Sequence, residues 1–208
     1  MSSGELSGGG ARRIVKAMGR PDPRQSAPSG VWGMALFLCA EVALFGTIIG
    51  SYFYLESVDK SWPPHGVAKP EVLLPVLATT YLLLTLVPIH IAARASRQGR
   101  RGRTVAAIAI ALLAQCGYLA WQIVLFSDDL HKFSPRQTAY GSIYFTMLAV
   151  HHAHVLFGIA LDLALIWQLI AKGLTRYWRI AVRNLALYWY VVSTLAIFVL
   201  FTQISPSL

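Results

Sequence analysis

Long runs of apolar residues alternate with short polar connections along this chain. Five such runs cover residues 31–55, 72–93, 104–126, 140–171 and 185–204. A helix needs about 20 mainly apolar residues to cross the roughly 30 Å hydrocarbon core of a bilayer, and each run is long enough. The pattern therefore predicts an all-α fold, a polytopic membrane helical bundle with five transmembrane helices, in which residues 30–208 form one domain. Residues 1–29 are rich in Gly, Ser, Pro and Arg, and we expect them to form a flexible basic N-terminal tail.

The charged residues indicate which way these helices cross the membrane. Only 13% of the residues are charged and 56% are hydrophobic, which is typical of a membrane protein. Most of the 18 basic residues fall in the segments 12–24, 94–103 and 172–183, which share one side of a five-helix bundle. Because loops rich in Lys and Arg stay in the cytoplasm, we expect the N-terminus there and the C-terminus outside. This placement explains the net charge of +9 without nucleic acid as a partner.

Ionisable side chains within the predicted helices need a reason, because each costs about 2.5–3.5 kcal/mol to insert. Glu41 lies near the middle of the first run, and four such residues lie in the fourth, namely His151, His152, His154 and Asp162. At 100° per residue, His151 and His154 share a helix face and Asp162 returns to within about 20° of His151, whereas His152 points elsewhere. We expect this stripe to meet Glu41 in a buried polar network. The network either links the helices or serves lipid binding or proton transfer.

Two histidines three residues apart on one helix face can also supply two metal ligands, and a carboxylate would complete a facial triad. The sequence holds no second His-x-x-His or Glu-x-x-His pair, and His90 lies near the end of the second run. We therefore expect no metal site, no ligated haem, and no catalytic or cofactor-binding residues in this chain. Cys39 and Cys116 fall within the first and third runs, where we interpret both as small buried apolar residues.

Four segments combine these polar groups with other distinctive residues. They read "WGMALFLCAEVALFGTIIGSYFYL", with Glu41, then "WPPHGV", "YGSIYFTMLAVHHAHVLFGIALDL", with His151 and His154, and "ALYWYVVSTLAIFVLF". Their order and spacing over residues 31–204 resemble the cytochrome c oxidase subunit III family, which is subunit III of the haem–copper oxidases. Besides the buried acid and the His-x-x-His pair, the matching positions are Trp62, Pro63, Pro64, Tyr140, Gly141, Ser142, Tyr188 and Trp189.

The chain departs from the family pattern at several positions. The last helix commonly reads Tyr-Trp-His-Phe-Val-Asp in the family, but here Tyr190 and Ser193 replace the His and the Asp. A common Gln-x-x-Glu in the third helix reads Gln122-x-x-Leu125, so that this acidic group is also missing. The five-span form further lacks the two N-terminal helices of seven-span members, which form a lipid-filled cleft there. These features identify a divergent five-helix bacterial form.

The resemblance implies an accessory role in an enzyme complex. Subunit III of this family binds no haem or copper, because those centres lie in the partner subunits I and II, which reduce dioxygen. This chain is then expected to be a non-catalytic integral subunit of an aerobic terminal oxidase in a bacterial cytoplasmic (inner) membrane. It would stabilise subunit I, bind phospholipid, and support oxygen access and proton uptake. In that setting His151 and His154 would join Glu41 in the polar interior of the bundle.

Other readings of the sequence stay open. The partner complex could be a quinol oxidase or the nitric oxide reductase that associates with a related small protein, and the electron donor is therefore open between cytochrome c and quinol. Further small subunits or a respiratory supercomplex could join it. A rival from another class is a free-standing membrane metalloenzyme that uses Glu41, His151, His154 and Asp162. A proton-coupled transporter is disfavoured, because the sequence has five predicted spans and no internal repeat.

Overall fold

The chain is almost entirely helical over the part that the structure describes. The computed structural model describes residues 29–59, 61–64, 67 and 71–207. Its elements are α2 (Ser29–Val58), α3 (Leu73–Leu84), α4 (Leu86–Arg97), α5 (Arg101–Lys132), α6 (Ala139–Lys172), α7 (Arg176–Ile204) and the 3-10 turn η1 (Ser205–Ser207). With α3 and α4 counted as one span, this part contains five helices long and apolar enough to cross a membrane, which confirms the predicted fold. The predicted tail lies outside the described residues except for Ser29, which begins α2.

Several helices extend beyond the apolar runs that predict them. The last helix begins at Arg176 rather than at residue 185, and the third helix covers Arg101–Lys132 rather than 104–126. Hydropathy reports only the part of a helix that lies in lipid, whereas a helix ends where its backbone finds a cap. Thr138 is such a cap, because its Oγ1 accepts a hydrogen bond from the backbone N–H of Gly141 at 3.0 Å, just before α6.

The second span is broken into two helices around Thr85. Pro88 lacks the N–H that would donate to the carbonyl of Leu84, so the regular ladder fails there. The backbone N–H of Thr85 bonds the carbonyl of Leu82 at 3.0 Å, and its hydroxyl donates to the same carbonyl at 2.7 Å. These tighter bonds satisfy the local backbone and allow the chain to bend between α3 and α4.

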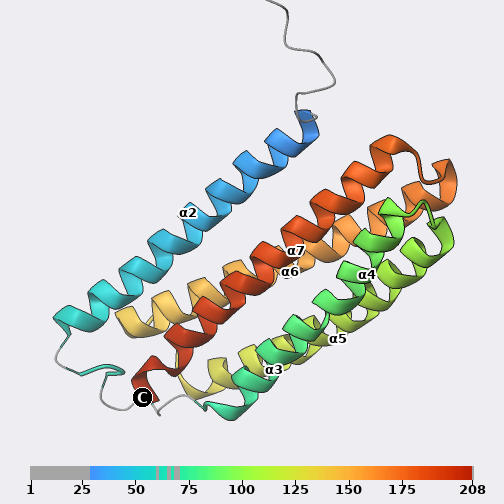
Figure 1. Cartoon of the computed structure of the whole chain (residues 1–208). Coiled ribbons are helices and arrows are strands. Elements are labelled where there is room, and N and C mark those ends of the chain that lie inside the picture. Colours follow the sequence, from blue (N-terminus) through green and yellow to red (C-terminus); the bar gives the residue numbers. More distant parts are fainter. Residues whose placement is uncertain (1–28, 60, 65–66, 68–70, 208) are drawn as a thin grey trace, which may run out of the picture.

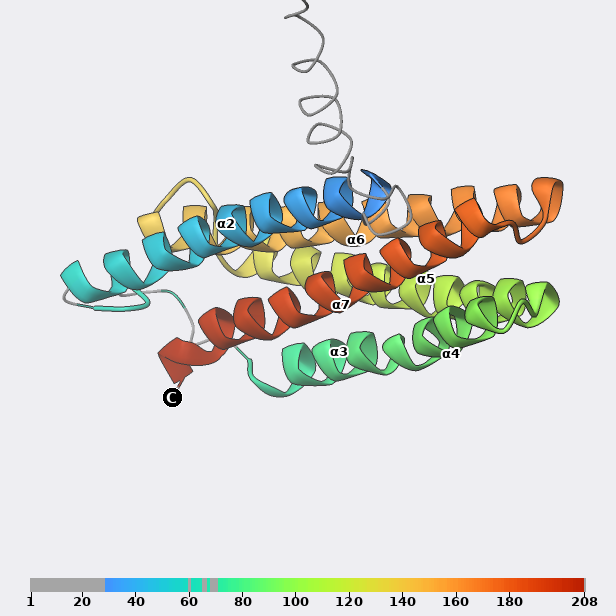
Figure 2. The same ribbon diagram turned by 45° about the horizontal axis from the view of Figure 1, so that its top comes forward.

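The helices form a bundle with one helix set to its side (Figure 1). α5 packs between α4 and α6, and α7 contacts both α4 and α6, whereas α2 packs only against α6 and α7 among the described helices. Figure 2 shows the same placement of α2 along one side of the bundle. The connections α4–α5 and α6–α7 lie at one end, which we call the α4–α5 end, and the opposite end is the α5–α6 end.

The outer face of α2 is apolar and exposed. Its exposed side chains include Trp32, Leu36 and Tyr54. Cys39 and Cys116 are also exposed, which corrects the expectation that both are buried in the protein. A lipid-facing position suits a small apolar side chain as well as the protein interior does, so hydropathy alone cannot separate the two.

α6 and α7 approach each other closely at a glycine. A Cβ atom on Gly158 would lie 2.6 Å from Cζ2 and 2.8 Å from Cη2 of Trp189, and 2.9 Å from Cε1 of Tyr188. Both aromatic residues are completely buried. Small residues permit such close packing of membrane helices, and this one lets the Trp189 ring lie directly against the α6 backbone.

Candidate functional site

The structure brings Glu41 of α2 and His154 of α6 together inside the membrane-spanning region. The carboxylate Oε2 of Glu41 lies 2.5 Å from Nε2 of His154. The two side chains are only 16% and 15% exposed. An acid–imidazole contact this short between two helices is a strong hydrogen bond shielded from water.

The second ring nitrogen of His154 limits the protonation forms of the pair. Nδ1 lies 2.6 Å from the carbonyl of Val150 and must carry a proton, because a carbonyl can only accept. Nε2 therefore either accepts from a carboxylic acid or donates, as imidazolium, to a carboxylate. The pair has zero net charge in both forms, which keeps the cost of burying it low. The hydroxyl of Tyr188 donates to the carbonyl of His154 at 2.7 Å and joins α7 to the same place.

His151 lies about 60° around α6 from His154 and faces α5. It is buried, and its Nε2 lies 3.4 Å from the hydroxyl of Tyr118. Gln122 donates to that hydroxyl oxygen at 2.9 Å, so that the Tyr118 proton is free to point toward His151. A neutral His151 ring then carries its own proton on Nδ1, for which the described residues offer no acceptor. A buried unpaired N–H is costly, so this imidazole makes a poorer set of hydrogen bonds than that of His154.

Asp162 lies farther along α6 and is completely buried. Trp189 of α7 donates its indole N–H to the carboxylate, with Nε1 at 3.2 Å from Oδ2 and 3.3 Å from Oδ1. With its amide nitrogen turned toward this carboxylate, Gln115 of α5 donates to Oδ2 at 2.6 Å and to the carbonyl of Ala111 at 3.2 Å. Asp162 therefore links three helices through neutral donors.

The four predicted site residues thus occupy three places. Glu41 and His154 bond each other, His151 bonds toward Tyr118, and Asp162 bonds toward Trp189, and no hydrogen bond among the described residues joins these groups. His151 and His154 differ by about 60° around the helix axis, enough to meet different neighbours. The Phe45 ring lies beside both imidazoles, with centroids 6.3 Å and 5.2 Å away.

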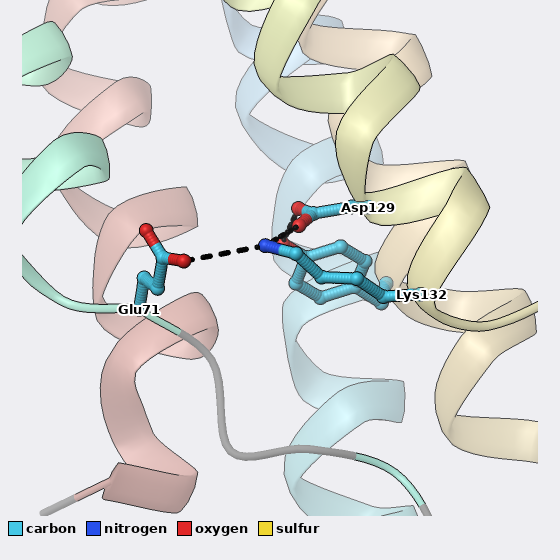
Figure 3. Close-up of polar contacts among 4 residues, drawn as sticks. Glu71, Asp129 and Lys132 are labelled. Carbon is cyan, nitrogen blue, oxygen red and sulfur yellow. Dashed lines mark hydrogen bonds and ion pairs between the residues drawn. The ribbon is translucent and has the colours of Figure 1, made fainter.

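A second polar group lies at the α5–α6 end and was not singled out from the sequence. The Nζ of Lys132 lies 3.4 Å from both Oε1 of Glu71 and Oδ1 of Asp129, as Figure 3 shows. The hydroxyl of Tyr144 donates to Oδ2 of Asp129 at 2.6 Å. These residues line a cavity of about 450 Å³, and His152 lines it as well. Asp129 and Lys132 stand three residues apart, which could have signalled the pairing.

The role of the polar residues of α5 was also missed by sequence reasoning, which named Gln122 only for its place in the family pattern. Gln115, Tyr118 and Gln122 follow an i, i+3, i+7 spacing, so they share one helix face. That face carries the partners of both His151 and Asp162. The spacing was visible in the sequence, but neutral polar side chains attract less attention in a transmembrane run than charged ones.

The departures from the family pattern have local structural consequences. Tyr190 reaches α4, where its hydroxyl lies 3.0 Å from Nδ1 of His90. Ser193 is completely buried, and its hydroxyl has no partner among the described residues. Leu125 lines the cavity at the α5–α6 end. At this position the chain therefore has an apolar side chain in the cavity wall, where the family's acidic residue would add a charge.

Metal ligation needs several donor side chains at one point. Across the residues that the structure describes, no group of three or more His, Cys, Asp or Glu side chains lies close enough to hold a metal ion. The set considered for a metalloenzyme, Glu41, His151, His154 and Asp162, is divided among separate helix interfaces.

Comparison with known proteins identifies a family and several relatives that this chain resembles. The model of the family described as "Cytochrome c oxidase subunit III" matches residues 25–205. Cytochrome c oxidase subunit 3 of Synechocystis sp. is 28% identical over 151 residues, which cover 72% of this chain and 61% of that relative. Quinol oxidase subunit 3 of Bacillus spizizenii is 30% identical over 149 residues, covering 70% and 71%. Cytochrome bo(3) ubiquinol oxidase subunit 3 of Pseudomonas aeruginosa is 25% identical, covering 72% of each chain.

The bundle and its internal polar pairs define a multi-pass membrane protein with acid–imidazole and acid–indole links between its helices. The chain belongs to the cytochrome c oxidase subunit III family, whose matched members above are named as subunits of cytochrome c or quinol oxidases. The chain spans about three fifths of the Synechocystis relative and about seven tenths of the two quinol oxidase subunits.

Proposed function

We propose that this chain is a non-catalytic integral subunit of an aerobic terminal oxidase, set beside the subunits I and II that carry haem and copper. The observation that carries the proposal is the family match, which covers the whole helical bundle rather than a single motif. The matched relatives are named as oxidase subunits, and the proposal extends that membership to an oxidase complex for this chain.

The proposed role toward subunit I is stabilisation. α2 supports this role, because it packs on α6 and α7 through one side and leaves apolar side chains such as Leu36 and Tyr54 exposed. Membrane helices with large exposed apolar faces can pack against another subunit or against ordered lipid. Phospholipid held along α2 would also keep an apolar route along which dioxygen reaches the catalytic subunit.

The proposed support of proton uptake rests on Glu41 and His154. The 2.5 Å contact between them allows a proton to sit on either side without a change in the net charge of the pair. His151 and Asp162 hold the neighbouring helices around this pair in our proposal. Their contribution is to the geometry and durability of the complex, and they perform no step of oxygen reduction.

Quinol oxidase is a second candidate for the partner complex. It is favoured by the matches to quinol oxidase subunits, which are as similar to this chain as the cytochrome c oxidase subunit is.

We place the protein in a bacterial cytoplasmic membrane, with the arginine-rich α4–α5 end facing the cytoplasm. The positive-inside rule supports this orientation, since Arg94, Arg97, Arg100, Arg101 and Arg103 gather there.

Purification through a tag on this chain in mild detergent tests the proposal. We expect mass spectrometry to find oxidase subunits I and II in the purified sample, and a reduced-minus-oxidised spectrum to show haem that belongs to subunit I. A copper-binding subunit II would indicate cytochrome c as the donor. A lone colourless chain, or a lone chain with stoichiometric metal, would contradict the proposed role.

A further inference from the structure

A basic pocket lies at the α4–α5 end, and it shares only His90 with the polar contacts described above. It has a volume of about 430 Å³, and its polar lining comes from His90, Arg94, Gln98, Arg100 and Arg103. These residues belong to the last turns of α4, the connection after it and the first turn of α5. Three guanidinium groups from two helices and a connection therefore border one small volume.

The charge of this pocket is not balanced by acids of the described chain. Every ion pair found among the described residues involves Lys132 or His154, so Arg94, Arg100 and Arg103 have no carboxylate partner there. Only some of the arginines at this end line the pocket. Arg101 turns away to donate to the carbonyl of Ile170 at 2.6 Å, near the end of α6, and Arg97 does not line the pocket.

Two helix ends of opposite polarity meet at the pocket, because the last turn of α4 lies beside the first turn of α5. α5 begins at Arg101, and Arg100 precedes it without a side-chain cap. The first N–H groups of a helix have no acceptors within the helix and carry a partial positive charge. The last carbonyl groups of α4 carry the opposite partial charge, so the three arginines rather than the backbone make the pocket attractive to an anion.

Apolar side chains continue from the pocket toward the middle of the membrane. Ile91 lines the pocket, and Val87 follows it on the face of α4 that carries Arg94, whereas Leu84 lies beyond the break, at the end of α3. Val87 and Leu84 are 57% and 62% exposed. The seven residues from Arg94 back to Val87 span about 10 Å, a third of the thickness of the hydrocarbon core.

A similar stripe follows the pocket on α5. Ile110 stands two helical turns after Arg103 on the same face and is 61% exposed. A basic pocket at the headgroup level with exposed apolar stripes below it matches the two parts of a phospholipid. Free inorganic phosphate would use the arginines but not the stripes.

We propose that this pocket binds the phosphate diester of an anionic phospholipid, held by Arg94, Arg100 and Arg103, with acyl chains along Ile91, Val87 and Ile110. The inference rests on the proposed function only for the position of the α4–α5 end at the membrane surface. Because this site lies on α4 and α5, it is separate from any lipid that covers α2.

Native mass spectrometry of the purified full chain, titrated with phosphatidylglycerol at fixed ionic strength, tests this site. Each basic side chain near an anionic surface contributes about 1 kcal/mol, so each lost arginine should weaken binding about fivefold. We expect the variant R94Q/R100Q/R103Q to bind phosphatidylglycerol about 100-fold more weakly than the unchanged chain. A variant that loses the same charge elsewhere at this end, R97Q/R176Q/R179Q, should bind like the unchanged chain.

Three results would overturn the proposal. The first is an equal loss of phosphatidylglycerol affinity in both triple variants, and the second is an unchanged affinity in the pocket variant. The third is displacement of the lipid from the unchanged chain by excess inorganic phosphate. Phosphatidylcholine with the same acyl chains carries the same phosphate diester beside a choline cation, so its binding should fall less in the pocket variant than the binding of phosphatidylglycerol. If the pocket variant does not fold, Arg94→Gln, Arg100→Gln and Arg103→Gln are compared singly with Arg97→Gln. Co-purification of haem-containing subunits is measured separately, so that failure of the lipid site and of the proposed function are distinguishable.

Discussion

Replacing Gly158 with alanine tests how closely α6 and α7 must approach. The new Cβ would lie 2.6 Å from Cζ2 of Trp189 and 2.9 Å from Cε1 of Tyr188. Carbon atoms prefer separations of about 3.5–4.0 Å, so that the helices or the rings must move by about 1 Å. Both rings are completely buried, and overpacking of a well-packed core costs about 1–3 kcal/mol.

Thermal unfolding of the purified chain in detergent, followed by circular dichroism, measures this cost. Gly46→Ala is the matched control, because a Cβ on Gly46 meets no atom within 4 Å. Both variants share the gain of up to about 1 kcal/mol from replacing a helical glycine with alanine, so their difference isolates the clash. For a chain of this length, about 2–4 °C per kcal/mol places Gly158→Ala about 2–12 °C below Gly46→Ala.

A second variant distinguishes the Trp189 contact from other causes. Trp189→Phe removes the outer ring atoms that the new Cβ would meet, so we expect Gly158→Ala to cost at least about 0.5 kcal/mol less in that background. If the cost is the same in both backgrounds, or if Gly158→Ala is as stable as Gly46→Ala, the close approach at Gly158 does not limit the packing of α6 against α7, and the reasoning is refuted.

Two further predictions concern hydrogen bonds. Glu41→Ala and His154→Ala should each lower the free energy of unfolding by about 1–3 kcal/mol, because each leaves a buried polar partner unpaired. The double variant should lose at least about 0.5 kcal/mol less than the sum, and additive losses would contradict the pairing. Tyr144→Phe removes the donor to Asp129 at 2.6 Å and should cost about 1.5–3 kcal/mol, and denaturant titrations of the purified chain in detergent measure all of these losses. The exposed Tyr54→Phe should change little, and equal losses at the two tyrosines would show that the Asp129 bond is unimportant.

The five spans were predictable because crossing a bilayer requires a local property, a run of about 20 apolar residues. The ends of the helices were less so, since α7 continues through Arg179 and Arg183 to Arg176, beyond the apolar run. The break near Thr85 also escaped prediction. Pro88 was visible, but an apolar proline does not interrupt a hydropathy pattern.

The candidate site shows where periodicity stops being informative. Periodicity places His151 and His154 on the same side of α6, yet one meets Tyr118 of α5 and the other meets Glu41 of α2. Which neighbour a helix face meets depends on how the helices are arranged and rotated, and a single sequence does not encode that arrangement in any local pattern. For the same reason the sequence did not predict the bond between Gln115 and Asp162, because it depends on the packing of α5 against α6.

The bond between Glu41 and His154 has a consequence for the order of events during synthesis. The two residues are 113 positions apart, so at about 5–20 residues per second the ribosome needs roughly 6 to 23 s to reach the second after the first. During that interval α2 enters the bilayer without its imidazole partner. Its apolar residues alone must outweigh an insertion cost of about 3 kcal/mol for an acidic side chain. The hydrogen bond that joins α2 to the bundle therefore forms only after the fourth span has been synthesised and inserted.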